Sequence, residues 1–310
     1  MTDIIGRAAM GRTRQEQDDF MRQTVLGILL AATFGTPAFA QAPPNAFRAD
    51  RALEGLTFTT ATPTPARATL AAQAPAADPV VSLSFGADVP SVYFFRGIRQ
   101  EGDPEGTFQP YLDVGVAASD MVSFNIGTWN SFHSGSADGF YESDFYATLN
   151  VSVLSVTYTA YTSPNDSFGT VHELAFSAGY DDSASAFPIA PSATLAFELG
   201  DNDADGGGNK GIYLQLGIEP GIPIADSPVS LSIPVTFGLS LKDYYHHSVT
   251  GDDGKFGFFS IGLMASAPVG DIFEVHGGVQ VLAFPDNILR EFNDGESSQV
   301  IGTVGFGFSF

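Results

Sequence analysis

The chain has 310 residues and a formal net charge of −22, from 13 basic and 35 acidic residues. So few Lys and Arg residues argue against nucleic-acid binding, which depends on cationic contacts to phosphate groups. The chain has no cysteine, so an exported form of it must be held together by something other than disulfides.

Residues from Met21 onward have the features of a secretory signal. Arg22 supplies a positive charge, residues 25–34 form an apolar core, and residues 37–40 end in an Ala-x-Ala cleavage site. This apolar run is shorter than the roughly 20 residues of a transmembrane helix. We therefore interpret residues 1–40 as a signal peptide for Sec-type export with a mis-called start, the true start being Met21. A genuine long n-region is the alternative.

Residues 41–79 differ in composition from the rest of the chain. Ala, Pro and Thr dominate, and apolar periodicity is absent. Such a segment cannot bury enough apolar surface to offset the entropy of ordering it. We expect a disordered, Ala/Pro-rich periplasmic leader, and no motif in it identifies a partner.

Residues 80–310 alternate between apolar and small or polar side chains. In residues 229–241, for example, nearly every odd-numbered residue is apolar and most even-numbered residues are Ser, Thr or Gly. A period of two places one apolar and one polar face on each strand. The pattern predicts about twelve strands, at 80–98, 107–117, 121–131, 140–150, 153–162, 169–180, 191–200, 211–220, 229–241, 256–267, 272–284 and 299–310.

Short and long connections alternate between these segments. Short joins near residues 119–120, 151 and 268–271 alternate with longer polar stretches at 99–106, 132–139, 200–210, 242–255 and 285–298. This favours an all-β fold, a transmembrane antiparallel β-barrel of outer-membrane type. A soluble β-sandwich or jelly roll is the alternative, and the export signal argues against it. Pro90 breaks the first of these segments, so we expect the strand to begin later or to carry a bulge.

The C-terminal segment is the clearest strand. Val300, Val304, Phe306, Phe308 and Phe310 share one face, and small or polar residues occupy the other apart from Ile301. In a soluble protein this would be an exposed, aggregation-prone edge, whereas in a barrel the apolar face meets lipid. Phe306, Phe308 and Phe310 also resemble the signal that outer-membrane proteins present to the barrel assembly machinery, which is the partner we expect.

The same alternation sorts the charges onto the lumen face. The predicted lumen-lining residues are Asp88, Arg96, Asp113, Trp129, Glu142, Asp144, Glu173, Glu198, Glu219, Glu274 and His276. A lumen lined with one sign of charge concentrates ions of the opposite sign. Inward aromatic residues, at Tyr111, Tyr161, Tyr213 and Trp129, predict a narrow bore. Two interpretations stay open: an open pore that prefers cations, or a plugged lumen in which the carboxylates pair with Arg96, Arg99 and water.

Three segments carry a family resemblance. Residues 91–98 (SVYFFRGI), 108–113 (FQPYLD) and 126–131 (IGTWNS) are similar to the TorF-type porins and related outer-membrane barrels of unassigned function. The resemblance covers roughly the first third of the barrel, and it implies a barrel and a porin without implying a ligand. Arg99 departs from the Ser or Thr that is frequent in that family.

No motif predicts catalysis, a metal or a cofactor. Adjacent residues His172 and Glu173 point to opposite faces, and Glu274 with His276 lacks a nucleophile motif. His246-His247 and the acidic run 201–205, which lacks the distal Glu of a calcium loop, are interpreted as solvated. The predicted function is an outer-membrane porin with a narrow channel for small polar or cationic solutes. The alternative is a non-conducting barrel scaffold that binds periplasmic or murein-associated partners.

Overall fold

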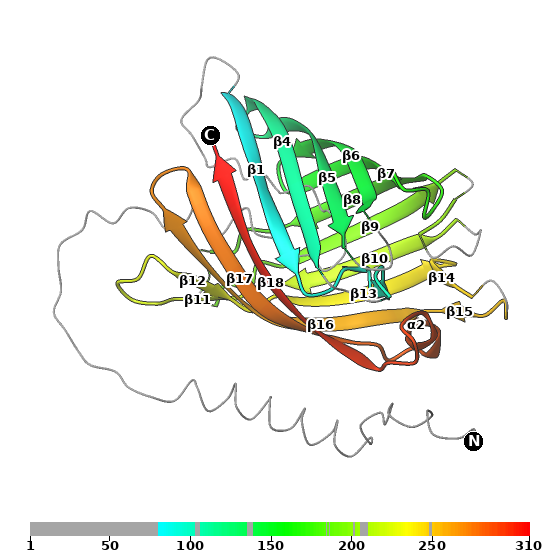
Figure 1. The fold of residues 1–310 in the computed structure, drawn as a ribbon. Coiled ribbons are helices and arrows are strands. Elements are labelled where there is room, and N and C mark those ends of the chain that lie inside the picture. Colours follow the sequence, from blue (N-terminus) through cyan, green and yellow to red (C-terminus); the bar gives the residue numbers. More distant parts are fainter. Residues whose placement is uncertain are drawn as a thin grey trace, which may run out of the picture. The chain divides into compact units, whose positions relative to one another are not determined.

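The computed structural model describes residues 80–102, 106–134, 139–183, 185, 187–200, 202–204, 210–247 and 250–310. The signal peptide and leader predicted over residues 1–79 lie outside the described residues. The described part is an antiparallel barrel of twelve strands (Figure 1). The strands are β1 (Val80–Pro90), β4 (Thr107–Ser119), β5 (Val122–His133), β6 (Gly139–Val151), β7 (Leu154–Thr162), β8 (Val171–Gly179), β9 (Ser192–Leu199), β10 (Ile212–Ile218) continued by β11 (Gly221–Ile222), β12 (Ser230–Ser232) continued by β13 (Val235–Lys242), β16 (Phe256–Val269), β17 (Phe273–Ala283) and β18 (Ser298–Ser309).

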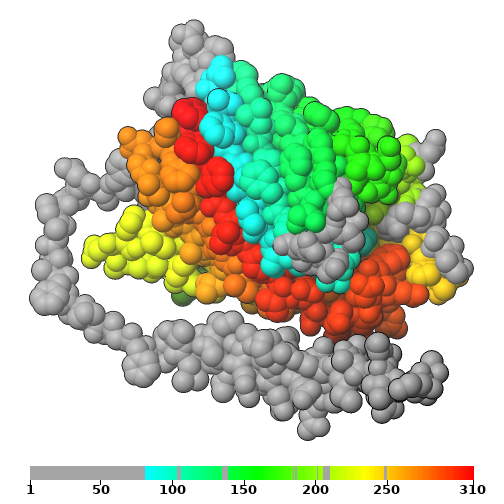
Figure 2. All heavy atoms as spheres, in the orientation of Figure 1, coloured from blue at the N-terminus to red at the C-terminus, as the bar shows by residue number. Residues whose placement is uncertain are grey.

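The first and last strands close the barrel. Strand β1 pairs antiparallel with β18, in a register that places Phe85 opposite Phe308 and Val89 opposite Val304. Figures 1 and 2 show these two strands, cyan and red, side by side along the seam. The barrel strands therefore have antiparallel neighbours on both sides, apart from the short β11, which pairs with β12 alone. A closed ladder of this kind is what a lipid environment requires.

The wall has polar side chains inside and apolar side chains outside. On β5, Ser123, Asn125 and Ser131 point inward and are buried, whereas Phe124 and Ile126 point outward and are 46% and 50% exposed. A soluble sheet would bury the aromatic and aliphatic side chains and expose the polar ones. This inverted pattern argues against the soluble sandwich and suits a wall in contact with lipid.

The observed strands follow the predicted segments closely, with two differences. The first strand ends at Pro90 instead of residue 98, because proline has no N–H to continue the ladder. The segment predicted at 229–241 is interrupted between β12 and β13, at Ile233 and Pro234. Pro234 still accepts a hydrogen bond from the Gly262 N–H at 2.9 Å, so the two pieces share the neighbour β16.

Three short elements were not predicted. They lie in the long connections after β1, β13 and β17, at the end of the barrel that we call the loop end. They are the hairpin of β2 (Phe94–Phe95) and β3 (Ile98–Arg99), the hairpin of β14 (Tyr245–His246) and β15 (Asp253–Gly254), and the helix α2 (Asn287–Phe292). The side chain of Asp286 caps α2 by accepting a hydrogen bond from the Ile288 N–H. No helix in the described part of the chain is long and apolar enough to cross a membrane.

In the connection between β8 and β9, the carboxylate of Asp182 holds two backbone N–H groups. It accepts hydrogen bonds from the backbone N–H groups of Ile189 and Ala190, at 2.8 and 2.9 Å. These two bonds, of which the one from Ile189 has the larger effect, hold the pKa of Asp182 below its usual value. A lowered pKa in the folded state means that the bonds stabilise this connection at neutral pH and are lost as the pH falls through that lowered value.

We therefore expect Asp182→Ala to speed amide hydrogen exchange at Ile189 and Ala190 at neutral pH. The unchanged protein should show the same loss of protection only in acid, below about pH 4. Asp120→Ala, in the short turn between β4 and β5, is the control and should leave exchange at Ile189 and Ala190 as it is. Equal protection in the Asp182→Ala variant would contradict this role.

Candidate functional site

The connection after β1 folds into the barrel. We call residues 91–101 the lumen hairpin, and its side chains Val92, Tyr93, Phe94, Phe95 and Ile98 are all buried. Its turn is Arg96-Gly97, with positive φ angles of 47° and 83°, and a two-residue hairpin turn with two positive φ angles suits the twist of the flanking strands. A Cβ at Gly97 would lie 2.9 Å from side-chain atoms of Leu289 and Phe258, so glycine is also required for space.

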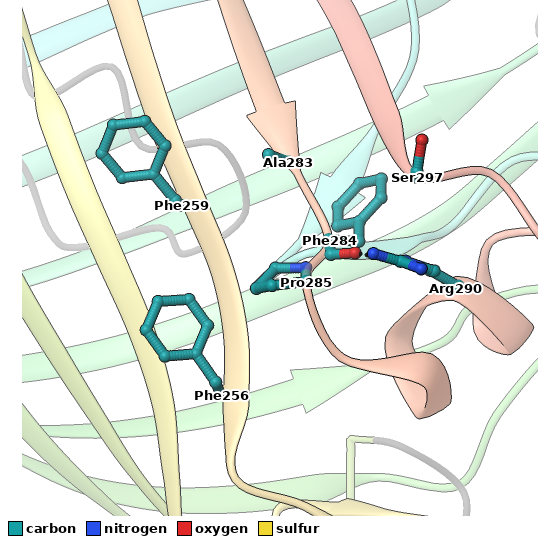
Figure 3. Close-up of a pocket in the computed structure, with 7 residues that line it drawn as sticks. All are labelled: Phe256, Phe259, Ala283, Phe284, Pro285, Arg290 and Ser297. Atoms are coloured by element: carbon teal, nitrogen blue, oxygen red, sulfur yellow. Dashed lines mark hydrogen bonds between the residues drawn. The ribbon is translucent and has the colours of Figure 1, made fainter.

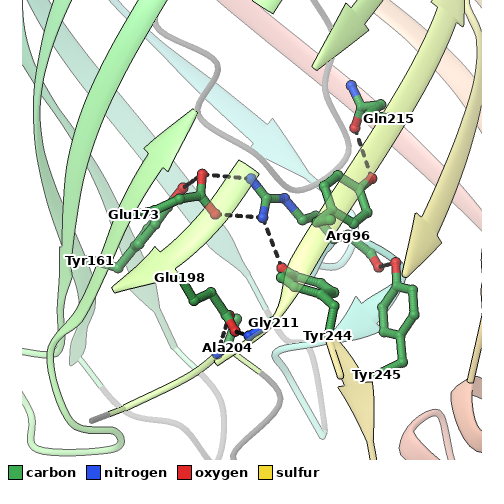
Figure 4. Close-up of polar contacts among 10 residues, drawn as sticks. Arg96, Tyr161, Glu173, Glu198, Ala204, Gly211, Gln215, Tyr244 and Tyr245 are labelled. Carbon is green, nitrogen blue, oxygen red and sulfur yellow. Dashed lines mark hydrogen bonds and ion pairs between the residues drawn. The ribbon is translucent and has the colours of Figure 1, made fainter. Parts of the chain in front are cut away.

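Arg96 carries the charge at the tip of the hairpin. Its guanidinium donates two hydrogen bonds to Glu173 on β8, at 2.6 and 2.8 Å, and one to the Tyr244 hydroxyl at 3.1 Å (Figure 4). Its Cζ also lies 4.2 Å from the centre of the Tyr213 ring, a cation–π contact. Arg96 is 1% exposed, and this bidentate pair is of the strong, planar kind that arginine forms with carboxylates.

The hairpin reaches across the lumen. Strand β1, from which it leaves, is separated from β8 by β4, β5, β6 and β7 in the order of the sheet. The Arg96–Glu173 pair therefore joins the hairpin to a distant part of the twelve-strand wall. Tyr161 on β7 also donates to Glu173, at 3.2 Å, which fixes the carboxylate from the side of the wall.

Other loops hold the backbone of the hairpin turn. The Tyr245 hydroxyl donates to the Arg96 carbonyl at 2.8 Å. Asn293, just after α2, donates to the Gly97 carbonyl at 2.7 Å and accepts from the Arg99 N–H at 2.9 Å. Two separate loops thus converge on one turn, and the aromatic and aliphatic side chains around it form one buried cluster.

The hairpin is closed at its far end by Glu101. Its carboxylate is 4% exposed and accepts hydrogen bonds from the Tyr93 N–H and the Thr107 hydroxyl. His133 on β5 lies 3.4 Å from the same carboxylate. The segment is therefore anchored at its tip and at its return to the wall.

The structure places the predicted lumen carboxylates on the inner face, where they have different partners. Glu198 accepts from the N–H groups of Ala204 and Gly211 and so holds the loop after β9 (Figure 4). The remaining partners are Asn125 and Tyr146 for Asp113, Ser232 for Glu219, and His276 for Asp88 at 2.6 Å.

Arg96 differs in position from what the alternation implied, and the other predicted residues lie on inward positions of the wall. Arg96 lies on the lumen hairpin, not on a wall strand, because β1 stops at Pro90. His276 pairs with Asp88 on β1, with its Nε2 2.6 Å from an Asp88 carboxylate oxygen. Trp129 is partly buried and packs on the Tyr93 ring, with ring centres 5.4 Å apart. Glu142, Asp144 and Glu274 also lie on inward positions of β6 and β17.

Sequence reasoning missed the residues that hold the hairpin, namely Glu101, Tyr244, Tyr245 and Asn293. All four lie in segments that were interpreted as polar loops. The adjacent tyrosines 244–245 were the one available signal, since two aromatic residues in a solvated loop are unusual.

Within the described residues, no group of three or more His, Cys, Asp or Glu side chains could hold a metal ion. His246 contacts Asp253 at 2.7 Å, and His247 contacts Glu291 at 3.2 Å. Part of the acidic run 201–205 lies outside the described residues.

A shallow groove of about 450 Å³ lies at the rim (Figure 3). Phe256 and Phe259 form one side, and Phe284, Pro285 and Arg290 form the other. Phe259 is paired with Ala283 on the outward face of the wall, so the groove opens outward and is distinct from the lumen. Arg290 is tied to the loop by donating to the Phe284 carbonyl at 2.7 Å.

Comparison with known proteins gives a likeness in structure only. No protein-family model matches the chain, and no curated protein matches it. A NanC porin structure has 10% identity and a TM-score of 0.43, over 74% of this chain and 99% of that chain. An outer-membrane channel from Pseudomonas putida F1 has 11% identity and a TM-score of 0.42, over 75% of this chain and 95% of that chain. Similarity at this level assigns neither a family nor a solute.

Proposed function

We propose that the protein is an outer-membrane channel whose narrow, acidic lumen passes small polar or cationic solutes. The observation that carries this proposal is the distribution of charge in the closed wall. The carboxylates that strands β1, β4, β6, β8, β9 and β17 contribute all lie on the inner face, while the outer face exposes apolar side chains. A negative lumen raises the local concentration of cations and lowers that of anions.

The lumen hairpin sets the width of the path in this proposal. It is held by two other loops and carries a cation, Arg96, that neutralises one carboxylate, Glu173. Pairing of this kind combines the two interpretations that the sequence left open. Glu173 is neutralised by the hairpin, whereas Asp113 and Glu219 accept hydrogen bonds from uncharged side chains only and so keep the lumen negative. We place the constriction at the loop end, where the hairpin lies.

A non-conducting scaffold is the second candidate. The buried cluster formed by the hairpin, α2 and the tyrosines at 244–245 favours it, because a filled loop end leaves less room for a path. In that case the barrel would present its turns and the segment before Val80 to periplasmic or murein-associated partners.

The remaining assignments belong to the same proposal. The exposed outer face supports outer-membrane lipid of a Gram-negative bacterium as the surroundings, and the alternating C-terminal aromatics support recognition by the barrel assembly machinery. The motifs at 91–98, 108–113 and 126–131 support membership of the TorF-type porins. A Sec-type signal before Gln41 supports the export route.

Conductance of the refolded mature chain (from Gln41) in planar bilayers under a salt gradient tests the proposal. We expect steady steps in the single-channel current. The reversal potential should have the sign that a channel permeable mainly to cations gives. A permeability ratio of cation to anion at or below one would overturn the cation preference. A folded, heat-modifiable barrel without conductance would overturn the channel and favour the scaffold.

A further inference from the structure

One carboxylate of the lumen lacks the partners that the others have. Asp144 on β6 is 0% exposed, and no described N–H or hydroxyl group donates to either of its oxygens; the Glu142 carboxyl lies within hydrogen-bonding reach of them. Asp113 lies on β4, two strands away from β6, and is also buried. Unlike Asp144, it accepts hydrogen bonds from Asn125 and Tyr146. An ionised carboxylate is strongly disfavoured when it is buried without a compensating partner, so Asp144 requires a positive charge or a proton.

Two further oxygen-bearing side chains surround Asp144. Glu142 precedes it by two residues on the same inward face and is 4% exposed. Tyr93 of the lumen hairpin has a fully buried hydroxyl next to Glu142, and Glu142 and Asp144 are the two carboxylates that act on it most strongly. The protein's own cation in this region, Arg96, is committed to Glu173.

We propose that Glu142, Asp144 and the Tyr93 hydroxyl bind a small hard cation, of the alkali or alkaline-earth class, inside the lumen. Carboxylate and hydroxyl oxygens are the ligands such ions prefer. Three protein residues supply fewer ligands than these ions take, so water completes the shell and the ion is held loosely enough to leave. The inference deepens the proposed function, because ions on the channel path would supply the site.

Trp129 provides a direct probe. It is the single tryptophan of the chain, its Cα is paired with that of Asp144 across β5 and β6, and its ring packs on Tyr93. Thallium(I) is a large monovalent cation that quenches tryptophan fluorescence on contact. The refolded full chain is titrated with thallium(I) acetate, and an inert organic cation keeps the ionic strength constant. We expect the fluorescence of Trp129 to be quenched along a saturable curve. Added sodium or calcium should reduce this quenching by competing for the site.

The matched variants are Asp144→Asn and Asp113→Asn. Both remove one buried lumen carboxylate, but only the first removes a ligand of the proposed site. We expect Asp144→Asn to abolish the saturable component and Asp113→Asn to keep it. If Asp144→Asn does not refold into a heat-modifiable barrel, Glu142→Gln takes its place, and it too should abolish the saturable component of the quenching. Competition by calcium but not sodium would assign the site to the divalent class.

Two outcomes would overturn the site. One is a linear, unsaturable quench in the unchanged protein at pH 8, which would mean that Asp144 and Glu142 share a proton instead of binding an ion. The other is a saturable quench that survives in both Asp144→Asn and Glu142→Gln. Conductance is measured separately, so a silent barrel with a saturable quench overturns only the channel, and a conducting barrel without one overturns only the site.

Discussion

Replacing Arg96 with Met should both destabilise the barrel and widen the channel. The substitution leaves Glu173 buried without its counter-charge, and Glu173 is then held only by Tyr161. Removing one partner of a buried ion pair typically costs about 3–5 kcal/mol. We expect the free energy of unfolding in urea, measured in detergent micelles, to fall by about that amount, and single-channel conductance to rise because the hairpin tip is no longer fixed to β8.

A double-mutant cycle separates the ion pair from other effects of the substitution. Arg96→Met combined with Glu173→Gln removes both charges, so it should recover part of the stability that Arg96→Met loses and still show raised conductance. Arg99→Met is the control, because Arg99 pairs with the exposed Asp294 at 3.3 Å, and exposed pairs contribute about 0–1 kcal/mol. Unchanged conductance in Arg96→Met would show that the other contacts of the hairpin suffice to hold it.

Val304→Arg should be the most damaging change on the outer face. Val304 is 62% exposed, lies near the middle of β18, and is paired with Val89 across the seam. An arginine on the lipid face at the bilayer midplane costs about 2–4 kcal/mol. We expect the free energy of unfolding in lipid vesicles to fall by that amount, while the inward-facing carboxylates and hence ion selectivity are unaffected.

Val300→Arg is the depth control for this prediction. Val300 points outward on the same strand and is 41% exposed, but it lies nearer the loop end, where the cost of arginine falls to about 0–1 kcal/mol. Equal costs at Val300 and Val304 would contradict an outer face that spans lipid. They would instead indicate an outer face in contact with water or with another protein.

The strands and their faces were predictable because their signal is local. An alternation such as that of residues 229–241 depends only on the period of the extended chain, so the pattern located the twelve strands within a few residues. It also placed carboxylates such as Asp113 and Glu198 on the inner face, where the structure has them. Pro90 predicted an irregularity in the first strand, but the alternation did not predict that the chain would then turn into the lumen.

The lumen hairpin could not be predicted in this way, because it depends on contacts between residues far apart in the sequence. Arg96 and Glu173 are 77 residues apart, and Asn293 and Gly97 are 196 apart. Asp88 and His276 meet across 188 residues through the pairing of β1 and β17 with β18. The sequence of a loop has no periodicity from which its contacts could be predicted. The barrel wall therefore follows from the sequence, whereas the position of the lumen hairpin inside the wall is decided by the closed tertiary structure.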